Sequence, residues 1–241
     1  MTADREADGN NEEPTVDESV AAEPPADDLQ AVYDRIADHF AKTREYAWPE
    51  VESFISDEVD RRGSLDCALD LGCGNGRHAQ GLAEADAEVV GLDVSGGLLA
   101  EARQRAAERG FDVDLVHGDA SRLPFADDRF SQVVYVATLH HLPTRAARQR
   151  SLSAVGRVLA PDGRGLVSAW STAHDRFDAD EGFDTTVDWT LPGGETVGRY
   201  YHIYDPDEFR ADLAAASVEV VDCRLSSGNC YAVVAPPEGV L

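Results

Sequence analysis

The chain has 241 residues, 43% of them hydrophobic, which suits one α/β domain with a sizeable core and some additional segments. It lacks the apolar run of about 18 residues that a membrane-spanning helix needs, and its four cysteines lack the CxxC spacing of a zinc site. The first residues, MTADREADGN, lack the basic and apolar regions of a signal peptide, so we expect a cytoplasmic protein that contacts no membrane and holds no metal.

The charge is strongly acidic: 46 acidic residues stand against 21 basic ones, the formal net charge is −25, and Lys42 is the single lysine. We interpret this composition as a halophilic adaptation, because salt screens the mutual repulsion of surface carboxylates beyond about 3 Å at 1 M. An acidic protein that avoids polyanions is the alternative. With salt adaptation the net charge does not exclude an RNA substrate, but local arginines would have to hold it.

The first predicted elements are a tail and two helices. Residues 1–28 carry many acidic and almost no large apolar side chains, which predicts a disordered tail before a single ordered domain at 29–241. A second helix is expected from Pro49, a favourable first-turn residue, to about Arg62. The first helix precedes it, and its apolar face carries Leu29, Val32, Tyr33, Ile36 and Phe40.

Strands and helices then alternate. This alternation indicates right-handed crossovers and a parallel sheet. The predicted buried strands are 65–70, 88–92, 113–117, 132–137 and 165–170. The predicted helices between them are 76–85, 96–109 and 144–159, the last ending at a turn, Pro161-Asp162-Gly163.

The C-terminal part breaks this alternation. Residues 171–204, rich in aspartate, glycine and aromatic residues, are predicted to be an insertion over the sheet edge. A helix at 207–216 and strands at 219–225 and 230–235 follow, and Ser226-Ser227-Gly228-Asn229 between the two strands predicts a hairpin. The expected fold is an α/β, Rossmann-like doubly wound sheet of seven strands, mostly parallel with an antiparallel C-terminal hairpin.

A glycine-rich loop follows the first predicted strand, in the stretch LDLGCGNGRH. Gly72, Gly74 and Gly76 stand at alternate positions after Asp70, at the sheet edge where open α/β proteins bind ligands. A dinucleotide fingerprint needs glycine at the sixth position of this run, which is Arg77, and a phosphate loop of the type GxxxxGK[ST] is absent. These departures favour a ligand that is not held by phosphate groups.

An acidic residue followed by GxGxG resembles the cofactor loop of class I S-adenosylmethionine-dependent methyltransferases. The resemblance implies that S-adenosyl-L-methionine lies with its amino-acid portion against the glycine backbone, and that Asp70 faces its ammonium group directly or through water. Asp93, followed by Val94 at the end of the second strand, would accept the ribose hydroxyls, and Asp119 with the backbone of Ala120 would read the adenine amino group. A helix N-terminal charge for Asp93 and a turn residue for Asp119 are the alternatives.

Two adjacent histidines follow the fourth predicted strand, in YVATLHHLP, close to the expected methyl group. We expect His140 to contact the cofactor and His141 to contact the substrate, with packing in the core or the loop as the alternative. Neighbouring histidines point to different faces and no third ligand is evident, so a metal site is not expected.

Segments outside the cofactor core resemble the tRNA wobble-uridine methyltransferase family, whose members esterify 5-carboxymethyluridine at the wobble position of certain tRNAs. The similar stretches lie between about residues 31 and 235 and read VYDRIADHFAKTREYAWPEVESFI, ATLHHLPT, GRYYHIYDPDEF and GNCYAVV. TREYAWP and RYYH are the specific ones. The chain departs from the family at Arg77 and His78, where relatives often carry lysine and an aromatic residue, and it lacks a basic surface.

The resemblance implies a tRNA substrate and a site for its carboxylate. Because a guanidinium holds carboxylate oxygens in a fixed fork, Arg44 and Arg199 are the expected ligands, with a surface salt bridge as the alternative for Arg44. The side chains that would stack on a splayed base or order a lid, or simply pack beneath it, are Trp48, Tyr200, Tyr201 and His202.

The resemblance also implies a partner, a small zinc-binding activator protein that pairs with the edge strand, here Val113 to His117. Two other functions stay open at this point. One is a methyltransferase that acts on a small molecule such as a quinone or a metabolite, and the other is a non-catalytic module that binds the cofactor.

Overall fold

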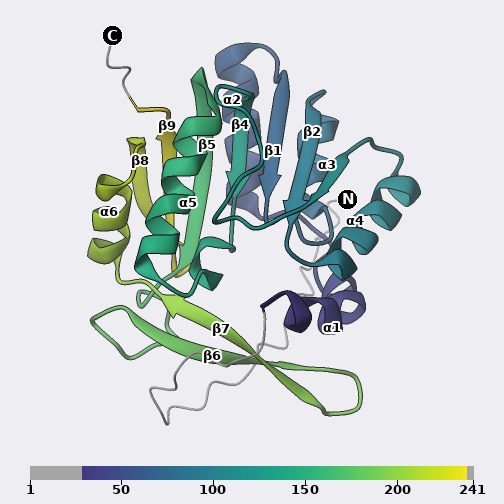
Figure 1. Ribbon diagram of the computed structural model, residues 1–241, viewed down its shortest axis with the longest axis vertical. Helices are drawn as coiled ribbons and strands as arrows, with labels where there is room; N and C mark the ends of the chain where they lie inside the picture. Colours follow the sequence, from purple (N-terminus) through teal and green to yellow (C-terminus); the bar gives the residue numbers. More distant parts are fainter. Residues whose placement is uncertain (1–28, 238–241) are drawn as a thin grey trace, which may run out of the picture.

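The computed structural model describes residues 29–237, so the predicted disordered tail lies outside the described residues. The chain builds one sheet with helices on both faces and a separate two-stranded hairpin at one end of it (Figure 1). The sheet has seven strands in the order β3-β2-β1-β4-β5-β9-β8. The predicted α/β doubly wound class is confirmed.

The first five strands of the sheet are parallel, and the last two run antiparallel as a hairpin, as predicted. Two residues, Ser227 and Gly228, connect this hairpin, and both have positive φ, as a tight hairpin turn requires. The strands are β1 (Cys67–Leu71), β2 (Glu88–Asp93), β3 (Asp114–His117), β4 (Phe130–Tyr135), β5 (Leu159–Trp170), β8 (Glu219–Ser226) and β9 (Asn229–Ala235).

Two hydrophobic clusters hold the helices to the sheet. Successive side chains of a strand point to opposite faces, so Leu69 and Leu71 belong to one cluster and Ala68 to the other. None of the helices in the described residues is long and apolar enough to cross a membrane. One face is covered by α2 (Pro49–Arg62) and α3 (Arg77–Glu84), and the other by α5 (Arg145–Val158) and α6 (Pro206–Ala215), while α4 (Gly96–Arg109) packs against β2, β3 and α1 (Leu29–Lys42).

The strand order reverses between β1 and β4. After β1 the chain crosses to β2 on one side, and after β4 it crosses to β5 on the other. Loops that leave neighbouring parallel strands in opposite directions open a crevice at the carboxyl ends, which is where this class of fold binds ligands.

The predicted insertion contains a second sheet, the antiparallel hairpin of β6 (Phe183–Thr190) and β7 (Thr196–Ile203). β7 packs against α1 and against the 3₁₀ turn η1 (Leu139–His141) that follows β4. The hairpin therefore lies across the carboxyl ends of the central strands together with α1, and not over a lateral edge of the sheet (Figure 1).

The predicted turn at Pro161-Asp162-Gly163 is wrong, because these residues belong to β5. The pairing of β5 with β4 shifts register between Phe130 and Gln132, which face Leu159 and Arg164. The extra residues form a bulge, so the strand begins immediately after α5 and not after a separate turn.

Candidate active site

A cavity of about 330 Å³ lies at the crevice between β1 and β4. Its walls come from the loops after the first four strands, and α1 and β7 cover it. The lining residues that the sequence predicted are Gly72, Gly74, Asp93, Val94, Asp119, Ala120, His141 and Tyr200.

The glycine loop forms one wall of this first cavity. Gly72 has a φ of +73°, and a Cβ built on it would lie 2.1 Å from Oγ1 of Thr138. Gly76 does not line the cavity, and a Cβ there would lie 3.3 Å from that of Ala102, so this glycine lets α3 pack against α4. The loop thus keeps the cavity open at Gly72 and Gly74 and fixes a helix at Gly76.

Asp70 lies behind the wall. Its carboxylate is buried and accepts the backbone N–H of Ala79 at 2.9 Å, in the first turn of α3. Burial raises the pKa of Asp70 to about 7, against the lowering effect of the Ala79 N–H and of Arg77. The structure therefore gives Asp70 a contact with the helix start, and its predicted contact with the cofactor's ammonium stays a prediction.

Asp93 connects the loops that follow β1 and β2. Its Oδ2 accepts the N–H of Gly74 at 2.8 Å, and its Oδ1 accepts the N–H of Ser95 at 2.9 Å. Burial raises the pKa of this carboxyl, and these backbone N–H groups oppose the shift. Each oxygen keeps a lone pair beyond its backbone bond, so the carboxylate can also accept a pair of hydroxyls from the cavity.

Asp119 and Ala120 lie side by side in the loop after β3. Oδ1 of Asp119 accepts the N–H of Ser121 at 2.7 Å, which fixes the carboxylate in a turn at the rim. The carbonyl of Ala120 accepts the hydroxyl of Ser151 at 2.7 Å. Asp119 is exposed and Ala120 is buried, and both line the cavity. Their carboxylate and backbone groups are therefore available to hydrogen-bond the edge of an adenine.

The two histidines point to different places. His141 lines the first cavity, with Nδ1 2.9 Å from the carbonyl oxygen of Tyr200 and Nε2 2.9 Å from the hydroxyl of Tyr33. A carbonyl only accepts, so Nδ1 carries the proton and Nε2 accepts from Tyr33. Burial lowers the pKa of His141 to about 3, so the ring is neutral.

His140 does not line the first cavity. Its ring stacks on that of Tyr201, with centroids 4.8 Å apart, and its Nδ1 accepts the N–H of Trp170 at 3.2 Å. Its predicted contact with the cofactor therefore has no support in this arrangement.

A second cavity, of about 530 Å³, adjoins the first. Arg44 and Arg199, predicted from two distant segments, meet here, and Arg77 lines both cavities. Four arginines and five large aromatic side chains contribute to the walls: Arg44, Arg77, Arg176, Arg199, Tyr46, Trp48, Trp170, Tyr201 and Tyr231.

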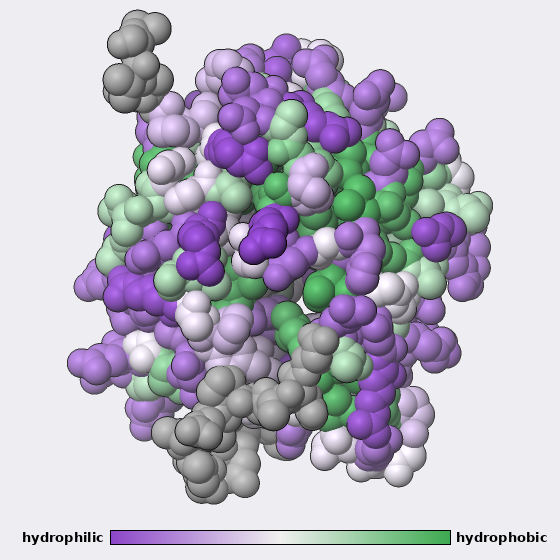
Figure 2. Space-filling view, in the orientation of Figure 1, coloured by the Kyte–Doolittle hydropathy of each residue, from purple (hydrophilic) through white to green (hydrophobic). Residues whose placement is uncertain are grey.

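Three of these guanidiniums have no carboxylate partner. Within residues 29–237, no carboxylate oxygen lies within ion-pair distance of Arg44, Arg77 or Arg199. Aromatic rings take that place: Cζ of Arg199 lies 4.8 Å from the centroid of Trp189, and Cζ of Arg44 lies 5.4 Å from it. Figure 2 shows hydrophilic residues over much of one molecular face. Because the net charge of the chain is −25, a cavity lined by several arginines is a local exception.

Asn75 joins the two cavities through the backbone. It lines the first cavity, and its side-chain amide donates to the carbonyls of Arg44 at 2.8 Å and Ala41 at 3.3 Å. Sequence reasoning missed Asn75 and Tyr33. A signal existed for Asn75, since it is the one polar residue inside the glycine loop.

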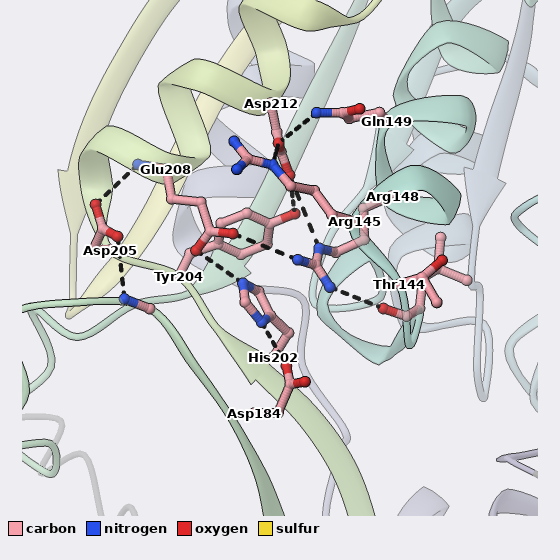
Figure 3. Close-up of polar contacts among 12 residues, drawn as sticks. Thr144, Arg145, Arg148, Gln149, Asp184, His202, Tyr204, Asp205, Glu208 and Asp212 are labelled. Atoms are coloured by element: carbon pink, nitrogen blue, oxygen red, sulfur yellow. Dashed lines mark hydrogen bonds and ion pairs between the residues drawn. The ribbon is translucent and has the colours of Figure 1, made fainter. Parts of the chain in front are cut away.

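A polar network anchors the hairpin to the helical face behind it (Figure 3). His202 on β7 lies between two carboxylates, with Nδ1 2.7 Å from Asp184 on β6 and Nε2 3.0 Å from Glu208 on α6. Asp184 also accepts the hydroxyl of Tyr200 at 2.8 Å, and Tyr200 lines the first cavity. His202 therefore helps to fix the β6–β7 hairpin in place. The predicted stacking of this residue on a base has no support.

The comparisons with known proteins agree with this site. The family described as "Methyltransferase domain" matches residues 68–163. A protein of Encephalitozoon cuniculi described as a methyltransferase, without a stated substrate, is 30% identical over 208 residues, which are 84% of this chain and 92% of that protein. The chain belongs to the methyltransferase family. The first cavity lies where this fold class places its ligands, which makes it the candidate cofactor site.

A solved structure supports the same fold. The S-adenosylmethionine-dependent methyltransferase from Clostridium acetobutylicum superimposes with a TM-score of 0.65 at 16% identity, covering 86% of this chain and 97% of that one. Two tRNA (carboxymethyluridine(34)-5-O)-methyltransferases are also similar. The Arabidopsis thaliana protein is 34% identical over 59% of this chain, and the Saccharomyces cerevisiae protein is 31% identical over 71% of it. The chain spans 32% and 60% of the length of these two proteins.

The residues of the first cavity fit S-adenosylmethionine. The wall at Gly72 has no room for a Cβ, both carboxylate oxygens of Asp93 keep a free lone pair, and Asp119 and Ala120 line the same cavity. When bound, this cofactor supplies an electrophilic methyl group on a sulfonium. The chain's own contribution would be to bind the cofactor in the first cavity, which α1 covers, and to hold an acceptor in the adjoining cavity.

Proposed function

We propose that this protein methylates the carboxylate of 5-carboxymethyluridine at the wobble position of tRNA. The observation that carries the proposal is the group of three guanidiniums without carboxylate partners, Arg44, Arg77 and Arg199, in a cavity that adjoins the cofactor cavity. In a chain with a net charge of −25, cations left unpaired around one cavity favour an anionic acceptor. The similarity to the two tRNA methyltransferases supports a modified uridine of tRNA as the methyl acceptor.

The chemistry suits the side chains. A carboxylate is ionised and nucleophilic near pH 7. A carboxylate oxygen forms the new bond to the methyl carbon while the sulfur–carbon bond breaks and its electron pair stays on sulfur, so no proton moves. Orientation and exclusion of water then do most of the work. The neutral His141, with both ring nitrogens already hydrogen-bonded, agrees with a reaction that needs no base.

The uridine ring would enter the second cavity between aromatic side chains. Trp48 and Tyr201 line it together with Arg44 and Arg199, an arrangement that suits a base removed from its stack. Tyr46 is 76% exposed and also lines this cavity, so it can contact a neighbouring nucleotide. We place the reaction in the cytoplasm, where tRNA is processed.

The test is nucleoside mass spectrometry of tRNA from cells that lack the protein. We expect 5-carboxymethyluridine to accumulate at the wobble position and its methyl ester to disappear, and re-expression of the wild-type chain to restore the ester. Unchanged ester levels would contradict the proposal.

The activator protein belongs to the same proposal. β3 is the outer strand of the sheet, and only β2 pairs with it in the described residues (Figure 1). A strand edge of this kind can receive a strand from a small zinc-binding partner. The test compares the rate of tRNA methylation by the purified chain alone with the rate in the presence of that partner at equal concentration. Equal rates would contradict a role for the activator protein.

A small-molecule acceptor is the second candidate. The acidic surface favours it, and Glu45 and Glu50 line the arginine cavity beside the cations. A cell extract with a labelled methyl donor separates the two candidates, because the label would then enter the organic phase and not the RNA.

A further inference from the structure

Arg77 is the one arginine that lines both cavities in the described residues. It is the first residue of α3 and directly follows Gly76, the end of the glycine loop. Its Cζ lies 5.4 Å from the ring of Trp48, which lines the second cavity only. The side chain therefore spans the junction that a methyl group must cross to reach an acceptor.

The protein stabilises this cation poorly. A positive charge in the first turn of a helix is repelled by the helix dipole, and Arg77 is half-buried in that turn. Burial and the nearby Arg44 lower the pKa of Arg77 to about 10, and Asp70 opposes them only in part. Asp70 accepts its one described hydrogen bond from Ala79, and Arg77 forms no ion pair with any carboxylate in residues 29–237.

We propose that Arg77 is a catalytic residue that binds the acceptor's anionic group at the junction of the two cavities and selects a carboxylate over its uncharged amide. The inference rests on the proposed function. Arg44 and Arg199 line only the second cavity and hold the remainder of the acceptor. Arg77 has the additional role of placing one carboxylate oxygen toward the cofactor.

The geometry suits this role. Contact with Trp48 fixes the position of the guanidinium, and a fixed fork sets the direction of both carboxylate oxygens. An oxygen held by one lone pair keeps another for the methyl carbon. Arginine keeps all its protons throughout, because the ester forms without proton transfer. A lysine would supply the same charge with less control of direction.

The experiment compares a carboxylate with its isosteric amide. The full chain is titrated with 5-carboxymethyluridine and with 5-carbamoylmethyluridine in the presence of S-adenosylhomocysteine. We expect the wild type to prefer the carboxylate at least tenfold. Arg77→Met and Arg77→Gln should lose this preference, and Arg77→Lys should keep part of it while its kcat falls more than its KM rises.

Arg129→Met is the matched control. Arg129 also lies over an aromatic ring, 5.1 Å from the centroid of Phe130, but lines neither cavity. We expect this variant to keep the wild-type preference. The circular dichroism spectrum and the unfolding temperature of every variant show whether the fold is intact.

Separate outcomes test the two proposals. A wild-type preference for the carboxylate that survives in a folded Arg77→Met variant overturns the role of Arg77, and so does a wild type without any such preference. Wild-type protein that forms no ester on tRNA overturns the proposed function alone. In that case phenylacetate and phenylacetamide replace the nucleosides as probes, and a folded Arg77→Met variant that still binds phenylacetate as the wild type does overturns the role of Arg77.

Discussion

Gly72 and Thr138 meet so closely that a Cβ on the glycine would lie 2.1 Å from Oγ1 and 2.5 Å from Cγ2 of the threonine. Gly72 comes from the loop after β1 and Thr138 from the loop after β4, so this contact joins the two sides of the crevice. Both residues line the first cavity. The absence of a side chain at Gly72 therefore keeps the first cavity open at this point.

Gly72→Ala should abolish cofactor binding and destabilise the fold. The φ of +73° costs a non-glycine residue about 1–2 kcal/mol, and the contact with Thr138 must be relieved by moving one wall. Gly63→Ala is the control, because Gly63 has a φ of +82° and no atom within 4 Å of its built Cβ. Thermal unfolding and titration with S-adenosylhomocysteine measure both effects, and equal results for the two variants would contradict the steric explanation.

Asp93→Ala should weaken cofactor binding by about 1.5–3 kcal/mol, the range for a lost hydrogen bond to a charged group. The substitution removes a ribose acceptor and also frees the N–H groups of Gly74 and Ser95. Calorimetric titration with S-adenosylhomocysteine measures the loss. Glu88→Ala, at the exposed start of the same strand, should bind normally. Wild-type affinity in Asp93→Ala would remove Asp93 from the site.

Asp70 should make the stability of the cofactor-free protein depend on pH. Its pKa is about 7 in the folded chain and 3.8 for an ordinary aspartate, so the folded state binds an extra proton between these values. Stability from this group is complete below about pH 4 and is lost as the pH rises to 7.

Asp70→Asn should therefore equal the wild type near pH 4 and exceed it at pH 8 by on the order of 3–4 kcal/mol. The amide oxygen can still accept the N–H of Ala79. Urea unfolding at both pH values measures the difference, and Asp114→Asn, which removes an exposed carboxylate, controls for net charge. A variant that is less stable than the wild type at pH 8 would rule out the buried charge.

His202 and Asp184 should be energetically coupled. Nδ1 of His202 lies 2.7 Å from a carboxylate oxygen of Asp184, and Nε2 lies 3.0 Å from one of Glu208, so each ring nitrogen has a carboxylate partner. A double-mutant cycle with His202→Gln and Asp184→Asn should give a coupling energy of about 1–3 kcal/mol.

The exposed pair Arg210 and Asp207, 2.9 Å apart, is the control and should show almost no coupling. The His202→Gln variant should also release S-adenosylhomocysteine faster than the wild type. The reason is that Asp184, the partner of His202, also accepts the hydroxyl of Tyr200, which lines the first cavity. A coupling energy as small as that of the control pair would show that the contact between His202 and Asp184 does not hold the hairpin.

Salt should stabilise the protein. A net charge of −25 repels itself in the compact state, and a Debye length that falls from about 10 Å at 0.1 M to about 3 Å at 1 M screens this repulsion. The unfolding temperature should rise with potassium chloride and much less with sucrose of equal osmolality. A flat or falling temperature would remove the support for the halophilic interpretation.

The sequence by itself determined the fold class and most of the predicted residues that line the first cavity, because both depend on local patterns. Apolar runs such as 88–92 lie in single strands; Asp93 ends β2 and Asp119 follows β3, at positions that the topology sets. The bulge in β5 and the β6–β7 hairpin escaped prediction, since pairing with β4 and contact with α1 decide them.

Only the tertiary structure decided the charge of the second cavity and the pKa values of the buried groups near the first one. Arg44, Arg77 and Arg199 come from three separate segments, the loop after α1, the start of α3 and β7, and line one cavity only in the folded chain. The neutral ring of His141 and the raised pKa of Asp70 likewise arise from burial among distant residues. Electrostatic energy depends on distance and solvent exposure in three dimensions, which order along the chain does not contain.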